Sequence, residues 1–337
     1  MQLTLLMPAC TQDSPVTDPR QADPAPAAER GTFAKGADVS WLTQMESEGI
    51  TFSNGNGIPT ECMQLLKEEC GVNAIRLRVW VNPAERWNNI EDVLVKARRA
   101  HSLGLRLMID FHLSDTWADP AHQSIPAAWS ALSPAQTRDA VKAHVGRMLS
   151  LLKQYDIEPE WVQIGNETRL GMMWPMGNLD NGSNYAELTS AGYDAVKEIF
   201  PQAQVIVHLD SGDQLGLYTR VFDYLRDSGG KFDMIGMSLY PDAGNWQATI
   251  DACVNNINTL YQRYGVPVMV CEIGMDYDQP EACRQCITAL MSRGQATGHL
   301  QGIFYWEPQA PAGYNGGYNK GCFDNGKPTQ ALEAFTQ

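Results

Sequence analysis

WVQIGNE, residues 161–167, and VPVMVCEIG, residues 266–274, are short apolar runs typical of β-strands, and each contains a single glutamate. Between the two glutamates, Glu167 and Glu272, lie two more segments that each combine a strand pattern with a helix pattern. In an eightfold barrel of alternating strands and helices, these glutamates would end the fourth and seventh strands, on opposite sides of the barrel mouth. Two carboxyl groups that face each other across a gap are what hydrolysis of a glycosidic bond with retention requires.

Six further apolar runs complete the strand pattern. The predicted strands are residues 33–40, 74–80, 106–113, 161–167, 204–209, 234–240, 267–274 and 302–308. Their near-continuous Val, Ile and Met content is typical of strands buried on both faces of a parallel sheet. Helical patterns such as those of residues 90–104 and 135–155 lie between them. Gly71, Gly104 and Gly265 each stand where a helix would end before the next strand.

Eight such alternations predict an α/β fold, a (β/α)8 TIM barrel with a single catalytic domain over residues 31–337. A doubly wound open sheet is the alternative, but no glycine-rich phosphate loop follows the first predicted strand. The composition agrees with a globular chain, since 44% of the 337 residues are hydrophobic and nine are Trp.

The chain is acidic, with 25 Lys and Arg against 39 Asp and Glu and a formal net charge of −14. Such a surface repels phosphate backbones, which argues against a nucleic-acid partner, and it also repels polyanionic glycans. A neutral polysaccharide is therefore the expected partner if the substrate is a sugar. No apolar run comes near the roughly 20 residues that a membrane span needs.

Residues 1–30 differ from the rest of the chain. MQLTLLMPAC is a short apolar stretch that ends in Ala9 and Cys10, and residues 11–30 are rich in Pro, Ala, Asp and Gln without periodicity. This composition predicts a flexible tether. An apolar stretch that ends in a small residue and Cys resembles a bacterial lipoprotein signal, with Cys10 lipidated. We expect an exported protein, lipid-anchored at the outer membrane or cell surface, or else secreted or periplasmic. The alternative is a frayed N-terminus or a mis-assigned start.

Polar and aromatic side chains gather where the predicted strands end, which is where barrel enzymes place their chemistry. In chain order these residues are Asp38, Arg76, Arg78, Trp80, Asp110, His112, Asn166, Glu167, His208, Asp210, Tyr240, Glu272 and Trp306. A barrel with a purely structural role has no need of such residues at nearly every strand end. The joint pattern predicts an active site.

A retaining glycosidase pairs an ionised nucleophile with a protonated acid. Glu272 is predicted to be the nucleophile, because Arg76 and Tyr240 can donate to it and keep it charged. Glu167 is then the acid/base, and the neighbouring Asn166 can reach the sugar 2-hydroxyl.

Tryptophans supply candidate sugar contacts. Trp306 suits the floor under the reacting sugar, because an aromatic ring packs against the C–H face of a pyranose. Trp117, Trp174 and Trp246, in the loops after the third, fourth and sixth predicted strands, are candidates for contacts with further sugars.

The motifs KGADVSW, GVNAIRLRVWVNP, DFHLSDTWADP, IGNE, MMWP, VIVHLD, GMSLYP and YWEP occur in this order. Together they resemble glycoside hydrolase family 53, the endo-β-1,4-galactanases of clan A, from about residue 35 to residue 308. DFHLSDTWADP is long and unusual, so the resemblance is specific, whereas IGNE alone indicates only the clan. The resemblance implies a TIM barrel that cleaves internal β-1,4-galactosyl bonds with retention, here in the galactan side chains of pectin.

By this resemblance Glu167 takes the acid/base position and Glu272 the nucleophile position. The family's residues around the attacked sugar fall on Arg76, His112, Asn166, His208, Tyr240 and Trp306. The candidate substrate-binding set is completed by four residues of the motifs DFHLSDTWADP, KGADVSW and VIVHLD, namely Asp115, Trp117, Asp38 and Asp210.

No metal and no cofactor are expected, and the chain is expected to act as a monomer. Some bacterial members of the family hold calcium with a long loop after the seventh strand, but here residues 274–286 reach the next helix quickly. Asp276 and Asp278 are too few for the six to eight oxygen ligands that calcium takes. After the eighth strand, residues 309–328 are rich in Gly, Asn and Tyr and are expected to shape distal subsites.

The seven cysteines after Cys10 are an odd number, so at least one thiol stays unpaired. Core or surface thiols are the expectation, and one or two disulfides after export are the alternative.

Two other functions stay open. Another clan A activity, a β-mannanase or an endoglucanase, would use the same residues, because strand-end chemistry does not separate axial from equatorial hydroxyls. A glycan-binding lipoprotein that has kept the fold without catalysis is the alternative from a different class.

Overall fold

Eight parallel strands close into a barrel in the computed structural model of the chain, which describes residues 29–337. The barrel strands are β1 (Ala34–Asp38), β2 (Ala74–Val79), β3 (Arg106–Phe111), β4 (Trp161–Ile164), β7 (Gln204–Leu209), β8 (Met234–Leu239), β9 (Val268–Ile273) and β10 (Leu300–Trp306). Each strand pairs with its neighbours in the chain, and β1 pairs with β10 to close the ring. The predicted TIM barrel is confirmed, and the open sheet is excluded.

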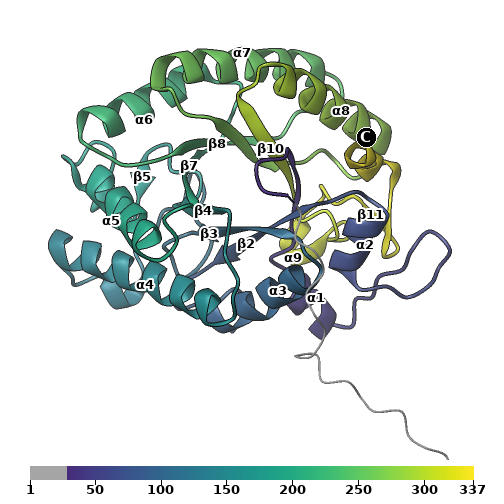
Figure 1. Cartoon of the computed structure of the whole chain (residues 1–337), viewed down its shortest axis with the longest axis horizontal. Coiled ribbons are helices and arrows are strands. Elements are labelled where there is room, and N and C mark those ends of the chain that lie inside the picture. Colours follow the sequence, from purple (N-terminus) through teal and green to yellow (C-terminus); the bar gives the residue numbers. More distant parts are fainter. Residues whose placement is uncertain (1–28) are drawn as a thin grey trace, which may run out of the picture.

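The helices surround the barrel, with α3 to α8 forming the outer ring (Figure 1). Their bounds are α1 (Leu42–Ser47), α2 (Cys62–Glu68), α3 (Ile90–Ser102), α4 (Pro134–Gln154), α5 (Asn184–Ile199), α6 (Leu215–Asp227), α7 (Trp246–Tyr264), α8 (Pro280–Ala296) and the short α9 (Tyr314–Gly317). Two 3-10 helices are η1 (Ala127–Trp129) and η2 (Gln330–Thr336). Two small hairpins outside the barrel are β5 (Gly171–Met172) with β6 (Gly177–Asn178), and β11 (Phe323–Asp324) with β12 (Lys327–Pro328).

Local sequence signals account for where the long helices begin and end. Ser133 and Gln136 form a capping box at the start of α4, in which each side chain binds the other residue's backbone N–H. The Asn89 side chain accepts from the backbone of Asp92 at the start of α3. Gly265 ends α7 with a left-handed backbone (φ 71°), a conformation that costs glycine little. The helices predicted for residues 90–104 and 135–155 are confirmed.

A layer of large side chains fills the end of the barrel opposite the cavity described below. Trp161 and Phe304 meet there edge to face, with ring centroids 5.9 Å apart, and both are fully buried. The layer is completed by Ala34, Ala74, Met108, Ile206, Met234, Met269 and Cys271. Gly36 leaves the room that the Phe304 ring occupies, since a Cβ on this glycine would lie 2.1 Å from the ring. The barrel is therefore a packed core, and only its other end is open to a ligand.

The fourth predicted strand ends earlier than expected. The sequence predicts a strand over residues 161–167, but β4 ends at Ile164. Gly165 and Glu167 both have left-handed backbones, with φ of 80° and 48°. A positive φ is unfavourable for a residue with a Cβ, so the surrounding fold holds Glu167 in a sharp turn just beyond the strand.

Several sequence predictions concern features outside the barrel strands. Residues 1–28, which include Cys10 and most of the predicted tether, lie outside the described residues. Within residues 29–337, no helix has both the length and the apolar character for crossing a bilayer. The seven cysteines of this part of the chain are all buried and unpaired. They are therefore core thiols, one of the two placements that the sequence left open.

The packed layer predicts the effect of one added methyl group. We expect Gly36→Ala to lower the free energy of unfolding by about 1–3 kcal/mol, because the buried Phe304 ring has no space to move into. Gly146→Ala on α4 is the matched control, since its nearest neighbour would be an Ile199 methyl 3.9 Å away. The control should raise stability by about 0.5–1 kcal/mol. Urea unfolding of both variants measures the effect, and a Gly36→Ala protein as stable as the wild type would contradict this account of the layer.

Candidate active site

A cavity of about 410 Å³ lies at the carboxyl ends of the barrel strands. Glu167 and Glu272 both line it. The other lining residues are Trp41, His112, Trp117, Ala118, Asp119, Asn166, Tyr240, Trp306, Asn315, Tyr318, Asn319 and Lys320. Its volume is in the range of small-molecule sites, about 300–1,000 Å³.

Glu272, near the end of β9, is held by two donors. The Arg76 guanidinium lies 2.9 Å from Oε1, and the Tyr240 hydroxyl donates to Oε2 at 2.7 Å. Burial raises the pKa of Glu272, and the Arg76 charge and the Tyr240 hydrogen bond oppose this rise. Both predicted contacts to this carboxylate are present.

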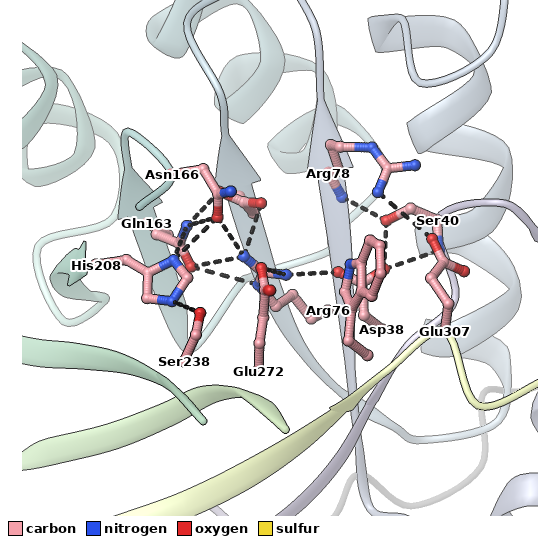
Figure 2. A network of polar contacts seen from close by, with 12 residues as sticks. Asp38, Ser40, Arg76, Arg78, Gln163, Asn166, His208, Ser238, Glu272 and Glu307 are labelled. Atoms are coloured by element: carbon pink, nitrogen blue, oxygen red, sulfur yellow. Dashed lines mark hydrogen bonds and ion pairs between the residues drawn. The ribbon is translucent and has the colours of Figure 1, made fainter. Parts of the chain in front are cut away.

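Arg76, on β2, is surrounded by carboxylates. Besides Glu272, it contacts Asp38 of β1 at 2.8 Å and Asp110 of β3 at 2.9 Å. All of these side chains are almost fully buried. Figure 2 shows Arg76 at the middle of a polar network that extends from His208 on one side to Glu307 on the other. One cation thus compensates the charge of three acids from three other strands.

Gln163 and Asn166 connect Arg76 to the next part of the network. The Gln163 Oε1 accepts from Arg76 at 3.1 and 3.3 Å, and its Nε2 donates to Asp110 at 2.6 Å. The Asn166 Oδ1 accepts from Arg76 at 3.0 Å, and its Nδ2 donates to the Ala118 carbonyl at 2.8 Å. Asn166 therefore lines the cavity with its amide fixed at both ends.

Two buried histidines complete the network in their neutral form. Burial lowers the pKa of His208 well below its ordinary value, and it also lowers the pKa of His112. His208 contacts the Ser238 hydroxyl at 2.8 Å. The His112 Nε2 lies 3.0 Å from Asp110, while its Nδ1 accepts from the Ala118 N–H at 3.2 Å. A neutral imidazole that donates on one nitrogen and accepts on the other satisfies these contacts.

Glu167 differs from Glu272 in its environment. Burial raises its pKa to about 8, and the nearby Glu272 charge contributes to that rise. Arg76 binds Glu272 directly but lies farther from Glu167, so the first proton that the pair loses belongs to Glu272. The proton that remains on the pair after this first ionisation therefore belongs to Glu167.

Aromatic rings form one side of the cavity. Trp306, at the end of β10, lies with its ring centroid 5.4 Å from Trp41 and 6.0 Å from Trp117. Tyr318 packs against Trp306 at 5.0 Å and against Trp41 at 5.3 Å. We call Trp41, Trp117, Trp306 and Tyr318 the aromatic wall. All four rings also line the cavity, where they offer apolar faces to a ligand.

A second hollow, of about 340 Å³, adjoins the cavity on the side of Glu167. Glu167 and Tyr240 line both hollows, whereas Glu272 lines only the first. The loops after β7 and β8 provide most of the second hollow, which includes the carboxylates Asp210, Asp213 and Asp242. We call it the acidic groove.

The structure brings most of the predicted site residues together, in two layers. Glu167, Glu272, His112, Trp117, Asn166, Tyr240 and Trp306 line the cavity. Asp38, Arg76 and His208 lie beneath these residues and position them. Asp210 lies in the acidic groove, where it pairs with Arg169.

Asp115 lies apart from both hollows. Its carboxylate accepts from the backbone N–H groups of Asn82 at 2.9 Å and Ala127 at 2.8 Å. These bonds tie the loop after β3 to two neighbouring segments. Trp174 and Trp246 also lie away from the cavity, and Trp174 donates to the Leu170 carbonyl at 3.0 Å.

Several members of the site were not among the predicted residues. Gln163 lies inside the apolar run WVQIGNE, and a lone polar residue in a buried strand was the available signal. Ser238 lies at the end of β8, where the strand-end rule applies, whereas Trp41 and Asp119 lie in the loops after β1 and β3. Residues 315, 318, 319 and 320 belong to the Gly- and Asn-rich segment that was expected to shape distal subsites, and they line the main cavity.

No group of three or more His, Cys, Asp or Glu in residues 29–337 is arranged to hold a metal ion. Asp276, one of the two acids considered for calcium, forms an ion pair with Lys320 at 2.7 Å. That the protein works without a metal or cofactor remains a prediction.

The sequence profile of glycosyl hydrolase family 53 matches residues 34–335. The chain belongs to this family. A probable arabinogalactan endo-β-1,4-galactanase A of Aspergillus terreus is 32% identical, with 89% of this chain and 92% of the relative covered. The resemblance to family 53 seen in the sequence motifs is confirmed.

Solved structures agree with membership of family 53. A structure from a study of two fungal β-1,4-galactanases superposes with a TM-score of 0.83 at 29% identity, over 90% of this chain and 98% of the other. The family 53 catalytic domain of Ignisphaera aggregans superposes with a TM-score of 0.81 at 30% identity, over 93% and 98% of the two chains. An endo-1,4-β-xylanase of Caldicellulosiruptor owensensis, at 14% identity and a TM-score of 0.66, shares the barrel fold alone.

The raised pKa of Glu167 makes the stability of this family 53 enzyme depend on pH. Unfolding returns the pKa from about 8 to its ordinary value of 4.5. Between these values the folded protein keeps a proton that the unfolded chain releases, so stability falls as pH rises through this window. Glu167→Gln removes the titration, so we expect the variant to gain stability over the wild type progressively from pH 5 to pH 8.

Urea unfolding at pH 5, 6.5 and 8 measures this gain. The control is the same substitution at an exposed glutamate in the loop after β2, Glu85→Gln, measured at the same three pH values. A Glu167→Gln difference that is the same at pH 5 and pH 8 would show that the carboxyl has no raised pKa.

Proposed function

We propose that this family 53 enzyme is a retaining endo-β-1,4-galactanase that hydrolyses internal β-1,4-galactosidic bonds in pectic galactan, with Glu272 as nucleophile and Glu167 as acid/base. The observation that carries the proposal is the unequal environment of two carboxyls in one cavity. Glu272 contacts the Arg76 guanidinium and accepts a hydrogen bond from the Tyr240 hydroxyl, whereas the pKa of Glu167 is raised to about 8. The galactan substrate is suggested by the names of the relatives.

In the first step, a Glu272 carboxylate oxygen attacks the anomeric carbon and forms a covalent galactosyl ester. The bond from that carbon to the leaving oxygen breaks, and Glu167 gives its proton to this oxygen. In the second step, Glu167, now ionised, takes a proton from water as the water oxygen attacks the same carbon. The ester bond to Glu272 breaks, the carboxylate is regenerated, and two inversions give net retention.

The surrounding residues support these roles. Arg76 keeps the Glu272 carboxylate ionised for attack and stabilises it again as the leaving group of the second step. The Tyr240 hydroxyl fixes the orientation of the same carboxylate through Oε2. The Trp306 ring lines the cavity next to both glutamates, where it can pack against the C–H face of the attacked galactose.

The two hollows separate the two halves of the substrate. The proton donor must face the leaving oxygen, and the nucleophile must face the opposite side of the anomeric carbon. The acidic groove is lined by Glu167 but not by Glu272, so it takes the leaving half of the chain. The aromatic wall then takes the half that becomes attached to the enzyme. Carboxylates of the acidic groove accept hydrogen bonds from sugar hydroxyls and repel anionic sugars, which favours a neutral glycan.

The first experiment is digestion of purified linear β-1,4-galactan, with products separated by size over time. We expect early release of mixed oligosaccharides, as in internal cleavage. Glu272→Gln should abolish release, because the amide cannot form the ester. Glu167→Gln should lower the rate by roughly 10²–10⁴-fold through loss of general acid catalysis.

Two controls separate the alternatives. Release from mannan or soluble cellulose but not from galactan would keep the two glutamates and discard the galactan substrate. If the wild type and Glu272→Gln hydrolyse none of the three glycans but bind one of them, the protein is a glycan-binding lipoprotein or a related binding protein. Full activity of Glu272→Gln would refute its role as nucleophile.

We also propose that the enzyme is exported, anchored by a lipid on Cys10, and active as a monomer. The support is the apolar run that ends in Ala9 and Cys10, followed by a Pro- and Ala-rich segment. Expressed in a bacterium from residue 1, the protein should sediment with membranes, and Cys10→Ser should move it to the soluble fraction. If the wild type and Cys10→Ser divide equally between membrane and soluble fractions, the lipid anchor is refuted. A molar mass of twice the chain mass, measured by light scattering on the soluble form, would refute the monomer.

A further inference from the structure

Arg78 is a buried cation that the proposed chemistry does not use. It lies on β2, two residues after Arg76, and its side chain is 1% exposed. Among the described residues its one ionic contact is Nη1 to the Glu307 carboxylate at 3.4 Å, at the limit of a hydrogen bond. Within residues 29–337, its Nε and Nη2 have no hydrogen-bond partner. Arg76, by contrast, has every nitrogen of its guanidinium bonded.

Tryptophan rings take the place of hydrogen-bond acceptors around Arg78. Its guanidinium carbon lies 4.2 Å from the ring centroid of Trp117, 5.0 Å from Trp80 and 5.8 Å from Trp41. At these distances the cation is attracted to the ring faces, most strongly where water is excluded. Trp41 and Trp117 belong to the aromatic wall and line the cavity, whereas Arg78 does not reach it. Arg78 therefore lies behind the wall.

Glu307 connects Arg78 to the backbone of the same wall. Its carboxylate accepts from the Trp41 backbone N–H at 3.1 and 3.2 Å and from the Gln309 amide at 2.7 Å. Its own backbone is left-handed, with φ of 48°, directly after Trp306. A strained, fully buried acid persists only where its surroundings hold it. Figure 2 shows Glu307, Arg78, Ser40 and Asp38 as one end of the network that reaches Glu272.

Arg106 is a second buried arginine of the barrel, and its hydrogen bonds can be compared with those of Arg78. It too is buried and stacks on a tryptophan, with 4.5 Å from its guanidinium carbon to the Trp161 ring centroid. Its nitrogens, however, are fully bonded, with two bonds of 2.7 Å to Glu160 and one of 2.9 Å to the Thr32 carbonyl. It lies at the start of β3, at the end of the barrel away from the cavity. The unmet hydrogen bonds of Arg78 thus are not a general feature of buried arginines in this protein.

We propose that Arg78 is a positioning residue for substrate binding: held by Glu307, it fixes the Trp117 ring as a stacking surface for a sugar next to the attacked one. The proposal rests on the proposed glycanase function and deepens it. A cation on one face of Trp117 leaves the other face for the apolar side of a pyranose. A flat guanidinium can contact three rings and a carboxylate at once, which the compact ammonium of Lys cannot do.

The test compares a long and a short substrate. Arg78→Met keeps the length and apolar character of the side chain but removes the cation. We expect the KM for linear galactan to rise about 10-fold, while kcat on an activated aryl β-galactoside, which carries no sugar besides the attacked one, stays within about 2-fold. Arg78→Lys should give an intermediate KM, and Glu307→Gln should raise KM in the same direction.

Arg106→Met is the matched control, because it removes a buried stacked arginine far from the cavity. It should lower the melting temperature and leave the KM for galactan unchanged. A double variant tests whether Arg78 acts through Trp117. In a Trp117→Ala background, Arg78→Met should no longer change the KM for galactan. The proposal is overturned if Arg78→Met lowers only stability, as Arg106→Met does, or if its effect on KM persists without Trp117.

Two further comparisons keep the test decisive. If Arg78→Met does not fold, Arg78→Lys and Glu307→Gln are measured in its place, and an unchanged KM in both refutes the proposal. Binding of β-1,4-galactotetraose to the Glu272→Gln variant, with and without the Arg78 change, gives the same comparison without turnover. An inactive wild type would refute the proposed function, whereas an unchanged dissociation constant would refute the role of Arg78.

Discussion

Burial of one guanidinium among three carboxylates is the constraint on which the rest of the site depends. Arg76 is almost inaccessible to solvent, and it holds Asp38, Asp110 and Glu272 at 2.8–2.9 Å. Breaking such a buried pair typically costs about 3–5 kcal/mol, because the remaining charge has no compensation. The four groups come from β1, β2, β3 and β9, so their pairing also fixes the mutual positions of these strand ends. The charge that the proposed chemistry requires on Glu272 is thereby part of the fold.

The same arrangement separates the behaviour of the two glutamates. Glu272 takes the direct contacts with Arg76 and Tyr240, which favour its ionised form. Glu167 stands in a left-handed turn beyond β4, beside a negative charge and away from the cation, and its pKa is raised to about 8. Placement alone thus gives two chemically identical carboxyls different proton affinities, and the raised pKa of Glu167 lowers stability at neutral pH.

Much of this could be read from the sequence, because strand ends in a barrel converge on one face. Repeated apolar runs indicated the barrel, and the polar residue at the end of each run indicated Arg76, Glu167 and Glu272. Position at a strand end does not distinguish polar residues that line the cavity from those that hold the cavity residues in place. Asp115 was expected in the cleft but ties loops together through backbone N–H groups. Trp41 and the residues near Tyr318 reach the cavity through loop conformations that no periodic pattern encodes.

Closure of the barrel has a consequence for how the protein is made. The first strand of the barrel, β1, pairs along its whole length with β10, the last strand of the barrel. Until residue 306 has left the ribosome, β1 lacks one of its two neighbours, and the ring stays open. Contacts between such distant parts of a chain form slowly, because a long loop must close first. Completion of the barrel is therefore held back until the last of its strands has been synthesised.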